Sequence, residues 1–126
     1  MRTGYDQLIE KPWGFYINIY QNTGYKVKVI VIYPREKLSE QRHKHRSELW
    51  SIAKGFGLIY KGFNTTMKAS GLVEGLNTKI DKMQWHSAEN VGEEDLIIVE
   101  TQLGDYLEED DIERRADKYG RCDASE

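Results

Sequence analysis

The segment 41–50 gathers most of the residue types in this chain that are able to bind a metal ion. It contains two of the three histidines of the sequence, preceded by an amide and followed by a carboxylate. In an extended strand, Gln41, His43 and His45 alternate and therefore lie on one face. Glu48 follows three residues after His45, beyond a short bend, where its carboxylate is able to join them. These positions predict a cluster of nitrogen and oxygen ligands.

Imidazole, carboxylate and amide ligands together suit one borderline divalent cation. We expect Zn²⁺ as the first choice, with Mn²⁺, Fe²⁺, Co²⁺ or Ni²⁺ as alternatives. A catalytic ion needs about three or four protein ligands and an open position, so one short stretch is not expected to supply them all. His86, the only other histidine, is the natural further ligand. The alternative is a hydrogen-bonded polar strand that carries histidines without a metal.

Composition limits the classes of function that the chain can have. With 126 residues it is long enough for one domain, which we place at residues 1–126, and too short for two. A net charge of -3 and the absence of a basic patch interleaved with aromatics argue against nucleic acid and anionic membranes as partners. Residues 1–6 lack the apolar core of a signal peptide, and the single cysteine, Cys122, is expected to be an idle thiol. We therefore expect a cytoplasmic protein.

Short β-rich runs separated by turn signals predict an all-β barrel or sandwich. The expected strands are residues 15–20, 25–33, 49–53, 56–63, 76–80 and 96–102, with further short strands and turns over 64–75 and a strand start at 85–86. Residues 1–10 are expected to be a loosely held lead-in. Residues 107–117 have acids first and arginines later, which suits a helix dipole and predicts a short C-terminal helix.

The strand expected at 25–33 has two different faces. One face begins with Lys26 and Lys28 and continues with Ile30 and Ile32. This order suits a strand that lines a polar mouth at one end and fills an apolar core at the other. The alternative is that both lysines reach solvent at the edge of a sheet.

Glu100 lies in the last strong strand and alternates there with Ile98 and Gln102. It therefore either reaches the same pocket as the metal ligands or forms an ion pair with a lysine at a strand edge. The tyrosine and valine face of residues 25–33 gives a physical reason to expect a homodimer.

The spacing of these residues resembles the two motifs of the cupin family. The first motif carries His-x-His, four residues, Glu, six residues and Gly, and the second carries His, three residues and Asn. The matching positions here are Gln41, His43, Glu48 and Gly55, followed by His86 and Asn90. An amide in the first histidine place is similar to phosphomannose isomerases. The resemblance implies a double-stranded β-helix, or jelly-roll barrel, with Gln41, His43, Glu48 and His86 as metal ligands.

A closer resemblance is to the cupin domain of type II mannose-6-phosphate isomerases, usually the C-terminal part of bifunctional enzymes with mannose-1-phosphate guanylyltransferase. The segment 11–16 resembles the opening of that domain, 38–50 its central signature, and 99–104 and 109–121 its end. The resemblance covers residues 11–121, the expected core. No counterpart of the nucleotidyltransferase half is present in this sequence, so we expect no guanylyl transfer from it.

The resemblance implies a metal-dependent sugar-phosphate isomerase that interconverts mannose 6-phosphate and fructose 6-phosphate through an enediol. The expected catalytic residues are His45, Glu100 and Arg114, where His45 is a base, an alternative ligand or a support for a ligand. The expected phosphate-binding residues are Arg46, Lys26 and Lys28.

Two other functions stay open at this point. Asp81 and Met83 replace a proline and a glycine of the isomerase family before the last ligand. This motivates a non-catalytic cupin that binds a metal and a sugar without turnover. The other alternative is a different metal-dependent cupin enzyme, such as a dioxygenase.

Overall fold

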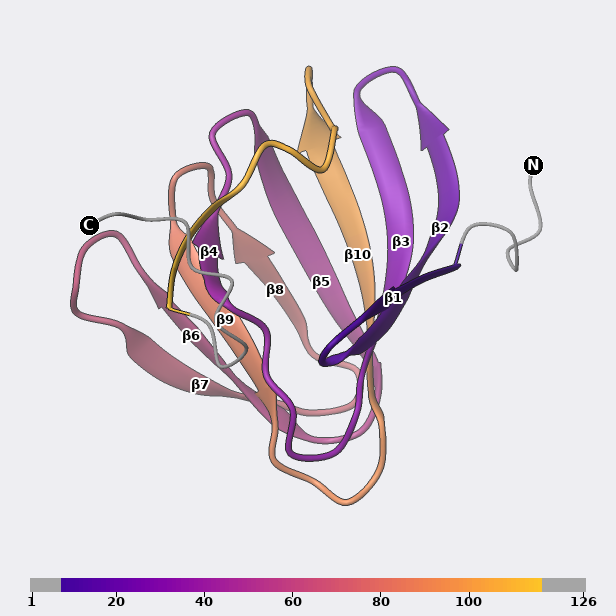
Figure 1. The fold of residues 1–126 in the computed structure, drawn as a ribbon, viewed down its shortest axis with the longest axis vertical. Coiled ribbons are helices and arrows are strands. Elements are labelled where there is room, and N and C mark those ends of the chain that lie inside the picture. The colour runs from indigo at the N-terminus through magenta and orange to yellow at the C-terminus, as the bar shows by residue number, and fades with distance from the viewer. Residues whose placement is uncertain (1–7, 117–126) are drawn as a thin grey trace.

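Eleven strands in two antiparallel sheets make up residues 8–116, the part of the chain that the computed structural model describes (Figure 1). The strands are β1 (Leu8–Lys11), β2 (Gly14–Asn22), β3 (Tyr25–Ile32), β4 (Glu40–Arg42), β5 (Arg46–Lys54), β6 (Gly57–Gly62), β7 (Lys68–Leu72), β8 (Asn77–Ile80), β9 (Trp85–Asn90), β10 (Leu96–Gly104) and β11 (Glu113–Ala116). The predicted all-β architecture is confirmed.

Strands from distant parts of the chain lie side by side in both sheets. The six-stranded sheet has the order β1-β2-β3-β10-β5-β8, and the five-stranded sheet has the order β11-β4-β9-β6-β7. The two sheets face each other as the walls of a barrel (Figure 1). No helix among residues 8–116 is long and apolar enough to cross a membrane.

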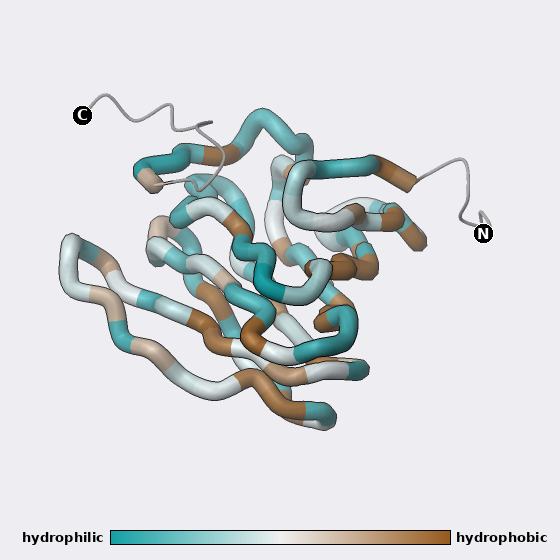
Figure 2. Tube along the Cα trace, turned by 60° about the horizontal axis from the view of Figure 1, so that its bottom comes forward, coloured by the Kyte–Doolittle hydropathy of each residue, from teal (hydrophilic) through white to brown (hydrophobic). Residues whose placement is uncertain are grey.

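The interior of the barrel changes from polar to apolar along the inward face of β3. Lys26 and Lys28 are buried at one end of this face, and Ile30 and Ile32 are buried at the other. Since β3 lies between β2 and β10, the two lysines are not at a sheet edge, and that alternative is wrong. Polar and apolar residues alternate along many of the strands in Figure 2, as expected for sheets with one face inside.

Strand register gathers the polar residues of the six-stranded sheet in one place. Lys28 on β3 lies opposite Glu100 on β10, which lies opposite Trp50 on β5. In the next inward-facing row, Gln102 on β10 lies opposite both Lys26 and Glu48. Residues directly opposite each other have Cβ atoms about 4.5–5.5 Å apart. Charged groups from three strands therefore meet on a small area inside the barrel.

The predicted C-terminal helix is wrong in the part of 107–117 that the structure describes. After β10 the chain crosses from the six-stranded to the five-stranded sheet, and residues 113–116 form β11, which pairs with β4 (Figure 1). The side chains of Arg42 and Arg115 both lie over the ring of Trp85, with guanidinium carbons 4.5 and 4.3 Å from its centre. These tertiary contacts outweigh the local charge pattern that favours a helix.

The first described residues also differ from the prediction. Leu8–Lys11 is not a loose lead-in, because it forms β1 and pairs with β2 from Leu8↔Ile17 to Lys11↔Gly14. Residues 1–7 and 117–126, which include Cys122 and the end of the expected core, lie outside the described residues. The predicted homodimer stays a prediction.

Gly55, the glycine of the first cupin-like motif, allows a test of this fold. Its φ is +97°, and an added Cβ would lie 2.6 Å from the backbone oxygen of Asp95, the residue before β10. Gly24 is a matched control, because its φ is +87° and an added Cβ would meet nothing within 4 Å. We expect Gly24→Ala to cost about 1 kcal/mol for its backbone conformation and Gly55→Ala to cost about 2 kcal/mol more. Equal losses in urea unfolding would contradict the close approach.

Candidate active site

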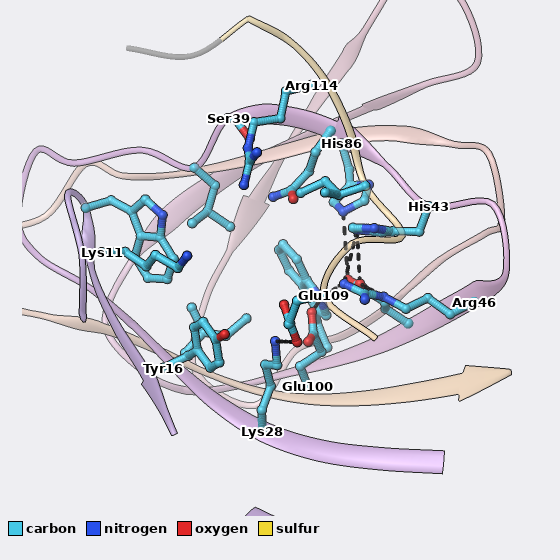
Figure 3. Close-up of a pocket in the computed structure, with 17 residues that line it drawn as sticks. Lys11, Tyr16, Lys28, Ser39, His43, Arg46, His86, Glu100, Glu109 and Arg114 are labelled. Atoms are coloured by element: carbon cyan, nitrogen blue, oxygen red, sulfur yellow. Dashed lines mark hydrogen bonds and ion pairs between the residues drawn. The ribbon is translucent and has the colours of Figure 1, made fainter. Parts of the chain in front are cut away.

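A cavity opens at the polar end of the barrel and encloses about 680 Å³ when its mouth is included. Its charged and metal-binding lining comes from both sheets and from the segment after β10. These residues are Lys11, Lys28, Gln41, His43, Arg46, Glu48, His86, Glu100, Glu109 and Arg114. In Figure 3, His43, His86 and Arg46 lie on one side, Lys11 and Tyr16 on the other, with Lys28 and Glu100 below. All predicted site residues except His45 and Lys26 line this cavity.

His43, Glu48 and His86 form a buried cluster with the geometry of a metal site. One candidate ligand atom from each residue lies within 4.8 Å of the others. His43 Nε2 is 3.2 Å from Glu48 Oε2, and His86 Nε2 is 3.8 Å from Glu48 Oε1. Gln41 lies opposite His86 in the register of β4 and β9 and lines the same cavity. The structure thus brings the four predicted ligands together.

Both histidines present their Nε2 atoms to Glu48 because their other nitrogens are held by the backbone. His43 Nδ1 donates to the carbonyl of Asp111 at 2.7 Å, and His86 Nδ1 donates to the carbonyl of Gln84 at 3.0 Å. Burial, followed by the neighbouring His86 and Arg46, lowers the pKa of His43 to about 3, so its ring is neutral. Two imidazoles, each with one nitrogen held by a backbone carbonyl and the other beside a carboxylate, are a donor set that suits a divalent ion. The residues present therefore fit a metal ion.

Glu48 and Glu100 form a buried carboxylate pair with different ionisation. Trp50 Nε1 donates to Glu48 Oε1 at 3.0 Å and to Glu100 Oε2 at 3.1 Å. Burial opposes ionisation of Glu48, but its neighbours together outweigh burial and lower the pKa of Glu48 to about 2. The largest of these contributions comes from Arg46, whose Nε is 2.9 Å from Glu48 Oε2. Burial and then the charge of Glu48 raise the pKa of Glu100 to about 7. Glu48 is therefore ionised, while Glu100 is poised to exchange a proton near neutral pH.

Buried cations lie beside this carboxylate pair. Arg46 is buried, and its Nη1 has no hydrogen-bond partner within the described residues. Lys28 Nζ lies 3.9 Å above the ring of Tyr16 and 2.9 Å from Glu109 Oε2. Lys26 is not part of the cavity lining, but its Nζ is 3.2 Å from the same oxygen of Glu109. The cavity therefore combines a candidate metal site with a region that suits an anion.

His45 lies outside the cavity. Its side chain is exposed, and its ring lies 5.5 Å from that of Tyr106. The prediction that His45 shares a face with Gln41 and His43 is wrong because β4 ends at Arg42 and the chain bends before β5. A catalytic role for His45 therefore has no contact with the cavity to support it.

The carboxylate of Asp111 holds the bend between β4 and β5, and the sequence analysis did not identify it as a site residue. Its two oxygens accept the backbone N–H groups of Lys44 and His45, each at 2.9 Å. Glu109, which contacts the two lysines, was not predicted either. Asp111 and Glu109 both fell in the segment that was predicted to be a helix. Their place in the block 109–121, which resembles the end of the isomerase domain, is the signal that pointed to them.

The sequence matches the family described as "Mannose-6-phosphate isomerase C-terminal" over residues 2–117. A mannose-1-phosphate guanylyltransferase of Escherichia coli is 37% identical over 113 residues, which cover 90% of this chain and 23% of that protein. The chain thus spans less than a quarter of the length of that relative.

Solved structures show the same fold at low sequence identity. The cupin domain of Schizosaccharomyces pombe Cnp3 has a TM-score of 0.66 and 14% identity, and the match covers 82% of this chain and 69% of that one. Bacillus subtilis oxalate decarboxylase, which is described with Mn(II) centres, has a TM-score of 0.73 and 15% identity. The match covers 81% of this chain and 29% of that one. The predicted cupin fold is confirmed.

Metal analysis tests the histidine and carboxylate cluster. We expect the purified protein to hold about one divalent ion per chain after loading and dialysis, because His43, Glu48 and His86 already lie together in the barrel. The variant His43→Ala plus His86→Ala should hold none, whereas the control His45→Ala should match the wild type. Equal metal content in the wild type and the double variant, measured by elemental analysis, would remove the metal site.

Asp111→Ala tests how the bend supports the ligands. Loss of the two backbone contacts should loosen His43 and weaken Zn²⁺ binding by about 10–100-fold, as is usual for groups that orient metal ligands. Asp110→Ala is the matched control, because the Asp110 carboxylate accepts from the hydroxyl of Tyr106 rather than from the backbone of the bend. Competition with a chromophoric chelator gives both affinities, and unchanged binding in Asp111→Ala would refute the supporting role.

Proposed function

This chain belongs to the mannose-6-phosphate isomerase C-terminal family, and we propose that it is a metal-dependent aldose–ketose isomerase acting on mannose 6-phosphate and fructose 6-phosphate. The observation that carries the proposal is a titrating carboxylate, Glu100, in one cavity with candidate metal ligands and buried cations. The Escherichia coli relative is named for guanylyl transfer, and this chain spans 23% of its length.

We assign the metal ion to His43, Glu48 and His86, with Gln41 as the fourth ligand. Zn²⁺ is the first choice for this set, and Mn²⁺, Fe²⁺, Co²⁺ or Ni²⁺ are alternatives. When bound, the ion supplies a Lewis acid that stabilises negative charge on the sugar oxygens.

Glu100 is the group that moves the proton. Isomerisation of the open-chain aldose moves a proton from C2 to C1 through an enediol, while the hydroxyl proton of O2 passes to O1. A base with a pKa near neutrality is suited to both steps, because it accepts the proton from C2 and then donates it to C1. Gln102 Nε2 donates to Glu100 Oε1 at 3.0 Å and Trp50 Nε1 donates to Oε2 at 3.1 Å, so both oxygens are oriented.

The buried cations bind the phosphate of the substrate. Lys28 and Arg46 line the cavity directly, and Lys26 lies behind them. A phosphate accepts several charge-assisted hydrogen bonds at once, and a planar guanidinium is well shaped to donate them. Arg114, which also lines the cavity, extends into it from the rim opposite Lys28 (Figure 3).

The loop that departs from the isomerase family keeps a contact with the metal ligands. Met83 has a φ of +65°, a conformation that glycine adopts more easily. Its backbone N–H donates to the carbonyl of His43 at 2.8 Å. The substituted turn thus has a glycine-type backbone and a hydrogen bond to the backbone of a candidate ligand, which supports a metal site in both the enzyme and the non-catalytic alternative.

A coupled assay with mannose 6-phosphate and fructose 6-phosphate on metal-loaded protein tests the isomerase. We expect Glu100→Gln to lower kcat by about 10²–10⁴-fold with unchanged metal content, because the amide retains the hydrogen-bonding shape but not the proton transfer. Glu94→Gln makes the same chemical change on the surface and should leave kcat unchanged. A fully active Glu100→Gln variant would exclude Glu100 as the base.

The same assay separates the two functions. No turnover by the wild type with any of Zn²⁺, Mn²⁺, Co²⁺ or Ni²⁺ would refute the isomerase. Metal binding without turnover would then support the non-catalytic cupin.

A further inference from the structure

Glu109 differs from the other charged residues of the cavity in how it is held. It lies on the segment between β10 and β11, which crosses the mouth of the barrel (Figure 1). Its side chain is 46% exposed, whereas its partners Lys26 and Lys28, on the central strand β3, are 8% and 5% exposed. The two ammonium groups are thus fixed inside the barrel, and the carboxylate reaches them from a surface segment.

One oxygen of Glu109 serves both lysines. Lys26 Nζ and Lys28 Nζ donate to Glu109 Oε2 at 3.2 and 2.9 Å. One carboxylate oxygen is thus the acceptor for two ammonium groups, and Nη1 of buried Arg46, which has no hydrogen-bond partner within the described residues, adds a further donor nearby. Buried cations are costly unless each is paired and hydrogen-bonded. The cluster therefore favours an anion with more charge and more acceptor atoms than one carboxylate.

We propose that Glu109 is an internal anion that occupies the phosphate position of the cavity and is displaced when the phosphate of the substrate binds. The inference rests on the proposed function in one respect, which is that the ligand carries a phosphate. Glu109 is then a specificity residue, because a neutral sugar brings no anion to take its place on the lysines.

The energetics favour such an exchange. A phosphate monoester carries a charge of about -1.5 to -2 at pH 7 and has three strong acceptor oxygens. Glu109 carries one charge: burial opposes ionisation, but Lys28, Lys26 and Arg46 together outweigh the effect of burial and lower the pKa of Glu109 to about 2. An ion pair with a partner as exposed as Glu109 contributes only about 1 kcal/mol or less, so its release to solvent is cheap.

The competing explanation is that Glu109 positions the two lysines for the ligand. The two roles predict opposite effects on anion binding. If Glu109 competes with the phosphate, its removal strengthens phosphate binding, and if it positions the lysines, its removal weakens phosphate binding.

Isothermal titration of the full chain with inorganic phosphate distinguishes them. We expect Glu109→Gln to bind phosphate about tenfold more tightly than the wild type, because the competing charge is gone. Glu108→Gln is the matched control, because Glu108 is the exposed neighbour, the lysines donate to Glu109 instead, and the substitution changes the net charge equally. It should bind as the wild type does. Equal or weaker binding by Glu109→Gln, or equal strengthening by Glu108→Gln, overturns the proposal.

A measurement on the wild type covers the case in which Glu109→Gln fails to fold. Hydrogen exchange of the amides in residues 105–112 should be faster in phosphate than in chloride at the same ionic strength, because displacement frees the segment. Unchanged or slower exchange contradicts displacement.

Turnover of mannose 6-phosphate, read on the same samples, reports separately on the isomerase. Tighter phosphate binding by Glu109→Gln without turnover supports the internal anion and refutes the isomerase. Turnover without tighter phosphate binding by Glu109→Gln supports the isomerase and refutes the internal anion.

Discussion

Charge balance inside a small barrel is the constraint on which this structure depends. Glu48 is almost fully buried and still ionised, because Arg46 lies against one of its oxygens and Trp50 donates to the other. His43 and His86 face the same carboxylate. An ionised group at this depth is expensive without such partners, so the position of each neighbour follows from the need to compensate Glu48. The same charge raises the pKa of Glu100, which links the candidate metal site to the candidate base.

The segment that closes the mouth of the barrel connects the fold to the site. Asp111 accepts two backbone N–H groups of the bend between β4 and β5 and, through its carbonyl, orients His43. Glu109 meets the lysines of β3 two residues earlier. Stacking of Arg42 and Arg115 on Trp85 then holds the end of the segment against the second sheet. One stretch of chain thus reaches a metal ligand, the cationic region and the opposite sheet.

Much of the fold was predictable, because alternation along a strand is a local property. The two faces of β3 predicted a mouth that is polar at Lys28 and a core that is apolar at Ile32, and both are present. The prediction of a C-terminal helix was wrong, because a charge gradient is also a local property and carries no information about the partner strand. β11 forms because the segment pairs with β4, where Glu113 lies opposite Arg42 and Arg114 lies opposite Gln41.

The sequence by itself determined the candidate ligands, since Gln41, His43, Glu48 and His86 stand at the positions of the cupin motifs that the sequence resembles. Only the tertiary structure decided that His45 faces away, that Glu100 has a raised pKa and that Glu109 shares an oxygen between two lysines. The physical reason is the range of the interactions. A strand direction depends on adjacent residues, whereas burial, ionisation and ion pairing depend on groups that the sheet register brings together from distant parts of the chain.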